Sequence, residues 1–110
     1  GMNKFAADAS AIVAVVTEKM KLAARIGAQF RGVQYSLIDI GIACEHLLLQ
    51  AAEDGIGSCW LGWFDERAVK RALDIPRRSK VDILLCLGYP ADPAQRPKVR
   101  RSLDDIRRYV

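Results

Sequence analysis

The longest apolar stretch of the chain, residues 33–53, restricts the fold more than any other feature. It reads VQYSLIDIGIACEHLLLQAAE, which is longer than a typical strand, and it ends at Asp54-Gly55, a favourable helix stop. Its apolar residues fall on nearly every face of a helix, and a helix that is apolar all round is buried on all sides. We therefore expect a long buried central helix.

Two further segments have the composition of strands. Residues 10–17, SAIVAVVT, are short, apolar and β-branched, which predicts a buried strand. Residues 80–88, KVDILLCLG, predict a second strand that stops at Gly-Tyr-Pro. We expect residues 57–63 to be extended or turn-like, and residues 18–32 to form a loop or a short helix. Together these elements indicate an α+β fold, with an antiparallel sheet and the long buried central helix.

Polar residues mark two short helices in the second half of the chain. Asp65 can cap a helix over residues 65–74, DERAVKRALD, and Ile75-Pro76 is expected to end it. Ser102 and Asp105 are spaced as a weak capping box, which predicts a last helical turn.

The chain is too small to bury the long helix alone. A domain of 110 residues buries only about 60–65% of the surface that its unfolded chain exposes. Two strands cannot cover a helix that is apolar on every face. A second copy of the chain is the simplest source of the missing apolar surface, so we expect a homodimer.

The positive charge is concentrated at the C-terminal end. Residues 94–110 carry six Lys/Arg and two Asp, which accounts for the whole net charge of +4. From about residue 91 we expect an extended basic tail on a neutral body. Such a tail indicates a local anion site or a nucleic-acid arm. We rank nucleic acid low and expect none as a partner, because the tail offers only Tyr89 and Tyr109 as aromatic platforms.

The three cysteines, Cys44, Cys59 and Cys86, are odd in number and widely spaced, which disfavours both a disulfide framework and a zinc site. No basic residue adjoins Cys59, so packing is favoured over a redox role. His46 is expected to be a core or interface histidine. No apolar run approaches the roughly 18 residues of a membrane helix and no basic-then-apolar leader is found, so we expect a cytoplasmic protein with no membrane partner.

Residues 55–65, GIGSCWLGWFD, place both tryptophans of the chain among three glycines. No Gly-Lys-Ser/Thr follows, so this is not a Walker loop, and the glycine spacing does not fit a dinucleotide fingerprint. Glycine permits unusual backbone angles and the close approach of a ligand. On its own, the segment favours core packing of Trp60 and Trp63 over contact with a flat ligand. Both interpretations hold if the side chains pack while the backbone between them meets a ring.

Several segments, in this order, resemble the nitroreductase family. They are Asp39–Ala43, Leu49–Gly62, Val69–Pro76, Leu85–Pro90 and Arg96–Ile106. The resemblance runs from about Phe5 to the end of the chain and matches only the later half of the family pattern. Family members usually begin with helices that carry an Arg-rich segment for the FMN phosphate and ribityl chain, and no such segment precedes Asn3. The resemblance therefore implies a single truncated nitroreductase-like domain over residues 1–110.

The resemblance also implies flavin chemistry, because these proteins are FMN-dependent oxidoreductases that use NADH or NADPH and hold FMN at a dimer interface. The stretch along the isoalloxazine ring is matched by Trp60, Leu61, Gly62 and Trp63, with the backbone N–H of Gly62 or Trp63 near flavin N5. Lys98 and Arg100 match the basic pair at the FMN phosphate, and a solvated basic tail stays the alternative interpretation for them. The resemblance supplies no catalytic side chain and no metal site.

Two classes of function follow. The first is an FMN-dependent NAD(P)H oxidoreductase that passes hydride to a nitroaromatic or quinone-like small-molecule acceptor. The second is a non-catalytic dimeric interaction protein, or a relic, that kept the dimer helix and lost flavin binding. The missing Arg-rich segment is the feature that favours the second class.

Overall fold

The computed structural model describes residues 3–18, 34–92 and 97–110. In chain order, the elements are η1 (Lys4–Asp8), β1 (Ala11–Thr17), α2 (Tyr35–Glu53), β2 (Gly57–Leu61), α3 (Glu66–Ala72), β3 (Lys80–Gly88) and α4 (Leu103–Ile106). The predicted loop or short helix at 18–32 falls outside the described residues, except for Glu18. The predicted strands at 10–17 and 80–88 and the α+β class are confirmed.

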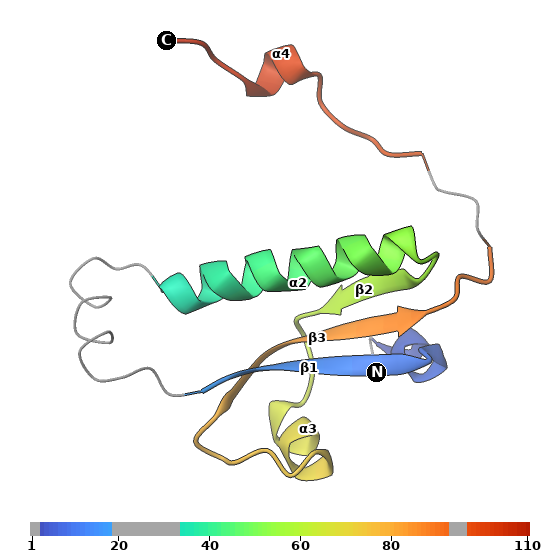
Figure 1. Ribbon diagram of the computed structural model, residues 1–110, viewed down its shortest axis with the longest axis vertical. Coiled ribbons are helices and arrows are strands. Elements are labelled where there is room, and N and C mark those ends of the chain that lie inside the picture. The colour runs from blue at the N-terminus through green and yellow to red at the C-terminus, as the bar shows by residue number, and fades with distance from the viewer. Residues whose placement is uncertain (1–2, 19–33, 93–96) are drawn as a thin grey trace.

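The three strands form one antiparallel sheet in the order β1-β3-β2 (Figure 1). The third strand, β2, comes from the segment that the sequence predicts as extended. β3 lies in the middle, and its Leu85 is fully buried (0% exposed) between Val13 and Trp60 of the neighbouring strands. The central strand therefore carries most of the core.

The prediction that β1 is buried is wrong in the single chain. β1 lies at the edge of the sheet, where a strand has a partner on one side only. Val13 and Val15 face α2 and are half-buried, whereas Ile12 and Val16 are exposed. The elements on the second face of the sheet do not reach over these two side chains.

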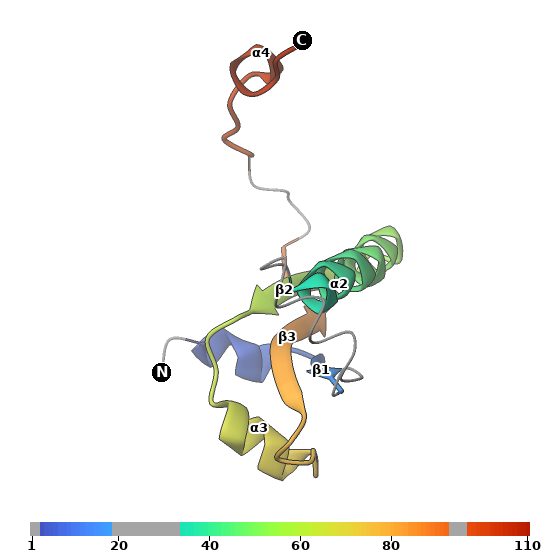
Figure 2. The same cartoon turned by 90° about the vertical axis from the view of Figure 1, so that its left-hand side faces the viewer.

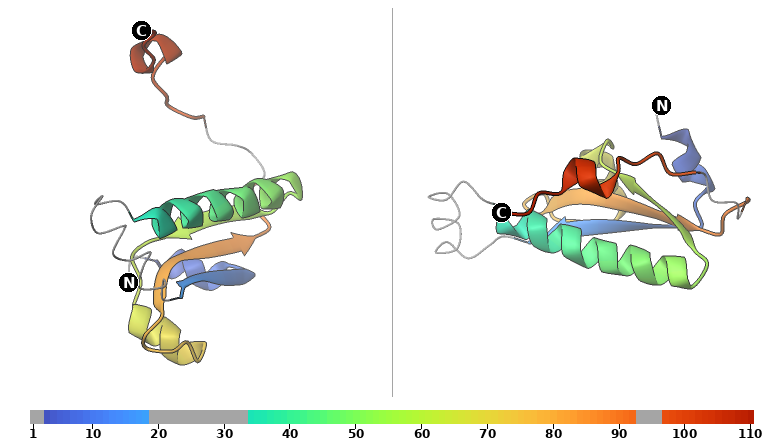
Figure 3. Two further views of the ribbon diagram at one scale, coloured as in Figure 1. Left: turned by 60° about the vertical axis from the view of Figure 1, so that its left-hand side comes forward. Right: turned by 90° about the horizontal axis from the view of Figure 1, so that it is seen from above.

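Helices cover both faces of the sheet, as Figures 2 and 3 show. On one face, Cys44 and Leu48 of α2 pack with Leu85. On the other face, the cluster contains Leu61, Val81, Leu84 and Cys86, with Ala6, Ala9 and Val69 packed against it. The second cluster therefore includes η1 and α3, and β3 contributes to both.

The long helix is confirmed, and so is its end, because Asp54 is the C-cap and Gly55 follows with a φ of +73°. Its burial is limited to one face, where Cys44, Leu48 and Ala51 are buried. The large apolar side chains of α2 that are exposed are Tyr35, Leu37, Ile38, Ile42, Leu47 and Leu49. His46 is also exposed, so it is not a core residue. A three-stranded sheet covers only one face of a helix. The single chain therefore lacks the apolar surface to bury the rest of α2, as the sequence predicts.

The cap of α3 is confirmed, because Asp65 Oδ1 accepts a hydrogen bond from the Ala68 N–H at 3.0 Å. The helix ends at Ala72, earlier than the predicted stop at Ile75-Pro76. Asp74 takes a left-handed φ of 52°, and the Ile75 N–H then bonds to the Lys70 carbonyl at 2.9 Å. The chain thus leaves the helix before it reaches the proline.

One carboxylate ties α3 to the start of β3. Glu66 Oε1 accepts from the Val81 N–H at 3.0 Å and pairs with Lys70 at 2.8 Å, while Oε2 pairs with Lys80 at 2.7 Å. The hydrogen bonds from Lys70, then from Lys80 and Val81, lower the pKa of Glu66 to about 2. Glu66 is therefore ionised wherever the protein is folded at ordinary pH.

The C-terminal tail projects from the body beyond α2 (Figure 1). One half of the predicted capping box is present, since the Asp105 N–H donates to Ser102 Oγ at 3.3 Å. The second bond joins the Ser102 hydroxyl to Asp105 Oδ2 at 2.8 Å, which is not the return bond to the backbone N–H that completes a capping box. The radius of gyration is 17.5 Å, against about 13 Å for a compact chain of this length. None of the helices in the described ranges combines the length and apolar character that crossing a membrane requires.

We expect Glu66→Gln to remove a pH-dependent part of the stability. The folded-state pKa lies below the ordinary value, so this stabilisation is complete above about pH 4.5 and is lost as the pH falls toward 2. The melting temperature of the wild type should therefore fall more steeply over this range than that of the variant. Glu53→Gln, at the exposed end of α2, is the matched control. Parallel curves for wild type and Glu66→Gln would contradict the assignment.

Candidate functional site

β2 and the loop after it position the predicted ring-binding segment. Trp60 lies directly opposite Leu85 and so shares the face that packs on α2. Leu61 points to the other face and is buried in the second cluster. Trp60 and Leu61 therefore lie on opposite faces of the sheet.

The prediction that both tryptophans pack in the core is wrong in the single chain. Trp60 is 40% exposed and Trp63 is 77% exposed. β2 is an edge strand and Trp63 lies beyond its end, so neither side chain has a full layer of structure over it. Cys59 is exposed too, on the opposite face from Trp60, and its predicted packing role is also wrong. The segment thus presents aromatic surface to solvent.

The three glycines of this segment differ in why the fold needs them. Gly55 has a positive φ of 73°, which side chains rarely adopt. A Cβ on Gly57 would lie 3.2 Å from the Gly88 carbonyl oxygen, because β2 and β3 approach closely there. A Cβ on Gly62 would meet only Ile83 Cδ1, at an ordinary 3.7 Å. Packing within the chain therefore does not require glycine at position 62.

A hydrogen bond that the sequence does not reveal anchors the loop. Asn3 Nδ2 donates to the Trp63 carbonyl, across 60 residues of sequence. Asn3 is also the N-cap residue of η1. No local pattern could predict this contact, because it depends on the fold bringing the N-terminus beside the end of β2.

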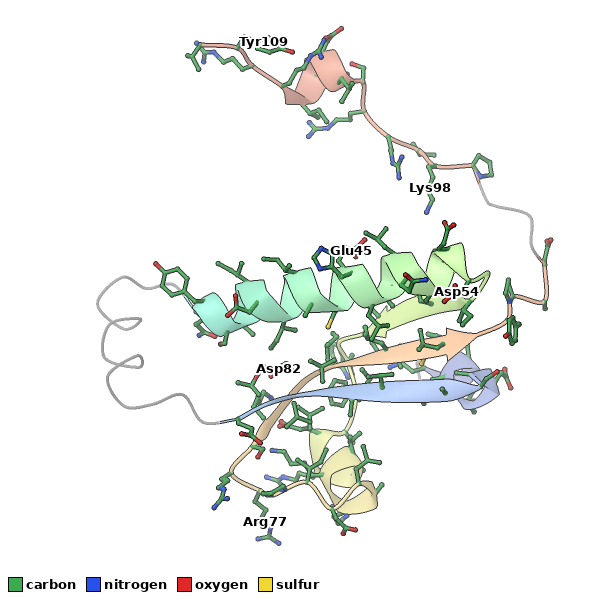
Figure 4. All side chains as sticks on the ribbon, viewed as in Figure 1. Glu45, Asp54, Arg77, Asp82, Lys98 and Tyr109 are labelled. Carbon is green, nitrogen blue, oxygen red and sulfur yellow. The ribbon has the colours of Figure 1, made fainter. Side chains whose placement is uncertain are left out.

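The predicted phosphate-binding pair lies on the tail. Lys98 and Arg100 are exposed, and Figure 4 shows Lys98 on the arm beyond α2, away from the sheet. Arg96, which belongs to the same sequence motif, lies outside the described residues. Within one chain, the structure does not bring Lys98 and Arg100 together with the segment Trp60–Trp63.

A cavity of about 860 Å³ opens elsewhere, along α3 and the turn after it. Its lining residues are Glu66, Arg67, Lys70, Arg71, Asp74, Ile75, Pro76 and Arg77. None of the predicted flavin-binding residues lines this cavity, so it is not the predicted site. In the described part of the chain, no three His, Cys, Asp or Glu side chains are grouped so as to hold a metal ion.

The pattern of the nitroreductase family matches residues 1–89, which is most of the chain. The chain belongs to the nitroreductase family. An iodotyrosine deiodinase of Thermotoga neapolitana is 32% identical over 72 residues, which cover 66% of this chain and 38% of that protein. The fold class predicted from the sequence is thus that of its family.

Solved structures of family members support the same fold. A nitroreductase family protein of Clostridium difficile 630 aligns with a TM-score of 0.68 at 25% identity, covering 93% of this chain and 60% of that one. An FMN-dependent nitroreductase of Clostridium difficile R20291 aligns with a TM-score of 0.59 at 20% identity, covering 89% and 53%. This nitroreductase-family chain therefore spans between about two fifths and three fifths of the length of these relatives.

The glycines give a stability prediction with a built-in control. Gly57→Ala should lower the free energy of unfolding by about 1–3 kcal/mol, because its Cβ is pressed against backbone. Gly62→Ala should change it by no more than about 0.5 kcal/mol. Urea unfolding of both variants checks this, and a large loss at Gly62 would mean that packing, not a ligand, requires glycine there.

Proposed function

We propose that this chain is an FMN-dependent NAD(P)H oxidoreductase whose flavin lies against Trp60, Leu61, Gly62 and Trp63. The observation that carries the proposal is Gly62: a glycine between two exposed tryptophans, at a position where the fold itself would accept a larger residue. Because glycine has no side chain, the backbone at this position is accessible to a flat ring. Family membership and an FMN-dependent structural relative support flavin as that ring.

When bound, FMN would supply the two-electron carrier for hydride from NADH or NADPH. The chain's own residues bind and orient it. Trp60 offers an aromatic surface on the α2 side of the sheet, and the Gly62 or Trp63 N–H is the donor that we assign to flavin N5. Asn3 fixes the Trp63 carbonyl and so holds this stretch of backbone in place. We assign no catalytic side chain and no metal.

We further propose that the site is completed by a second copy of the chain. The apolar side chains on the uncovered faces of α2 offer the surface that such a homodimer needs. Lys98 stands away from the body of its own chain, on an arm that extends past α2 (Figure 4), and Arg100 follows two residues later as an exposed residue of the same tail. In this arrangement the arm of one chain reaches the ring-binding segment of the other, and the two cations bind the FMN phosphate.

The acceptor that we propose is a small aromatic or quinone-like molecule, including nitroaromatics. The likeness to an iodotyrosine deiodinase supports an aromatic substrate. A flat acceptor would lie over the same ring surface that the two tryptophans border. We place the protein in the cytoplasm, where NADH and NADPH are available, with neither nucleic acid nor membrane as a partner.

The second candidate is a non-catalytic dimeric interaction protein. One observation favours it. A single chain has the exposed apolar face of α2 that a dimer needs, whereas its proposed ring-binding segment and its basic arm lie apart. This candidate predicts a stable dimer that takes up no FMN.

Retention of FMN separates the two candidates. We expect purified protein that has been mixed with FMN and freed of excess to keep flavin absorbance. The double variant Lys98→Ala/Arg100→Ala should bind FMN about 10- to 100-fold more weakly, because two charged hydrogen-bond donors to phosphate are lost. Arg101→Ala/Arg108→Ala removes the same charge from the same tail and is the control. Equal affinities of the two variants would contradict the phosphate role, and a colourless wild-type dimer would favour the interaction protein.

A further inference from the structure

The sheet brings together two cysteines that are far apart in sequence. Cys59 of β2 is the direct partner of Cys86 of β3 in the antiparallel ladder. Directly opposite residues of such a pair have Cα atoms about 4.5–5.5 Å apart and side chains on one face. A disulfide requires Cα atoms roughly 4.4–6.8 Å apart. The ladder therefore places the two Cα atoms within the range that a disulfide requires.

The two thiols differ in their access to solvent. Cys59 is exposed, whereas Cys86 is 5% exposed and belongs to the cluster beneath η1 and α3. Burial, and then the neighbouring Cys59, raise the pKa of the Cys86 thiol. Cys59 is thus the sulfur that a dissolved oxidant reaches first, and Cys86 is a protonated partner held behind it.

Neither thiol is committed to a competing interaction. Both are free, and Cys59 Sγ makes one weak hydrogen bond, to the Trp60 carbonyl at 3.6 Å. The third cysteine, Cys44, lies on α2 and packs with Leu48 and Leu85 on the opposite face of the sheet. The sheet therefore separates Cys44 from the pair and leaves one pairing within the chain.

We propose that Cys59 and Cys86 form a reversible disulfide in response to hydrogen peroxide or an organic hydroperoxide. The Cys59 thiol gives up its proton and its sulfur attacks the peroxide, so that an S–O bond forms while the O–O bond breaks. The departing hydroxide, or alkoxide, takes up a proton and leaves as water, or as an alcohol. The Cys86 sulfur then attacks the Cys59 sulfur: the S–S bond forms, the S–O bond breaks and water leaves with the Cys86 proton. The two thiols lose two electrons and the peroxide gains them. A dithiol reductant reverses the step by thiol–disulfide exchange.

The bond would lock an edge strand to the centre of the sheet. It joins β2 to β3 one residue before Trp60, at the entry to the exposed aromatic segment. Because a cross-link restricts the unfolded chain, we expect oxidation to raise the melting temperature by about 10 °C. This inference concerns thiols and stands whether or not the chain binds flavin.

The test uses the full chain carrying Cys44→Ala, so that only the proposed pair remains. Treatment with a stoichiometric amount of hydrogen peroxide should lower the intact mass by about 2 Da, the loss of two hydrogens. Peptide mapping without reductant should then link the peptides that contain Cys59 and Cys86. Dithiothreitol should restore both the mass and the original melting temperature.

A second substitution makes the result decisive. Cys59→Ser in the Cys44→Ala background replaces an exposed residue and should abolish the loss of 2 Da and the rise in melting temperature. The proposal is overturned if Cys59 is converted only to sulfenic or sulfinic acid, or if it cross-links only to a second chain. It is also overturned if the original chain, with all three cysteines, forms a disulfide through Cys44 instead. Cleavage after Glu53 would reveal this result, because the cut separates Cys44 from Cys59.

Discussion

Strand β3 is the element on which the sheet and the helices packed against it depend. It pairs with β1 on one side and β2 on the other, and its side chains enter both hydrophobic clusters. Leu85 packs against α2. The backbone N–H of Val81 donates to the Glu66 carboxylate, which ties α3 to the sheet. A strand in this position loses water from both faces and both edges, so its apolar composition follows directly from its place. Trp60 and Cys59 owe their positions to their ladder partners on β3.

The parts of the fold that rest on local chemistry could be predicted from the sequence. The end of α2 at Asp54-Gly55, the Asp65 cap and the Ser102 cap each depend on residues within a few positions of one another. Exposure could not be predicted in the same way. Tryptophan is usually well covered, which favours core packing of Trp60 and Trp63. β2 lies at an edge, however, where α2 covers Trp60 only in part, and Trp63 lies beyond the end of the strand. The early end of α3 depended on the backbone of Asp74, for which the sequence offered no glycine signal.

Contacts between residues that are distant in sequence also limit how much of the candidate site can be predicted from the sequence. The family resemblance points to Trp60–Trp63 and to Lys98 with Arg100. Within one chain the structure does not bring these two groups together, and both stay predictions. A Cβ at Gly62 would meet only Ile83 at an ordinary distance, so packing within the chain does not explain why this residue is glycine. The anchoring of Trp63 by Asn3 and the pairing of Cys59 with Cys86 both arise from the fold alone. The two cations fit the proposal only if a second chain receives the arm.

The central claim, that two chains share each flavin site, is tested most directly by mixing two defective variants. One chain carries Gly62→Val at the ring, and the other carries Lys98→Ala/Arg100→Ala on the arm. If the arm serves the partner's ring site, each mixed dimer has one site with both halves intact. At an FMN concentration that saturates the wild type but is too low for either variant alone, the mixture should after random exchange of subunits bind about a quarter of the FMN that wild-type protein binds. Recovery of no binding, with mixed dimers present, would contradict the shared site.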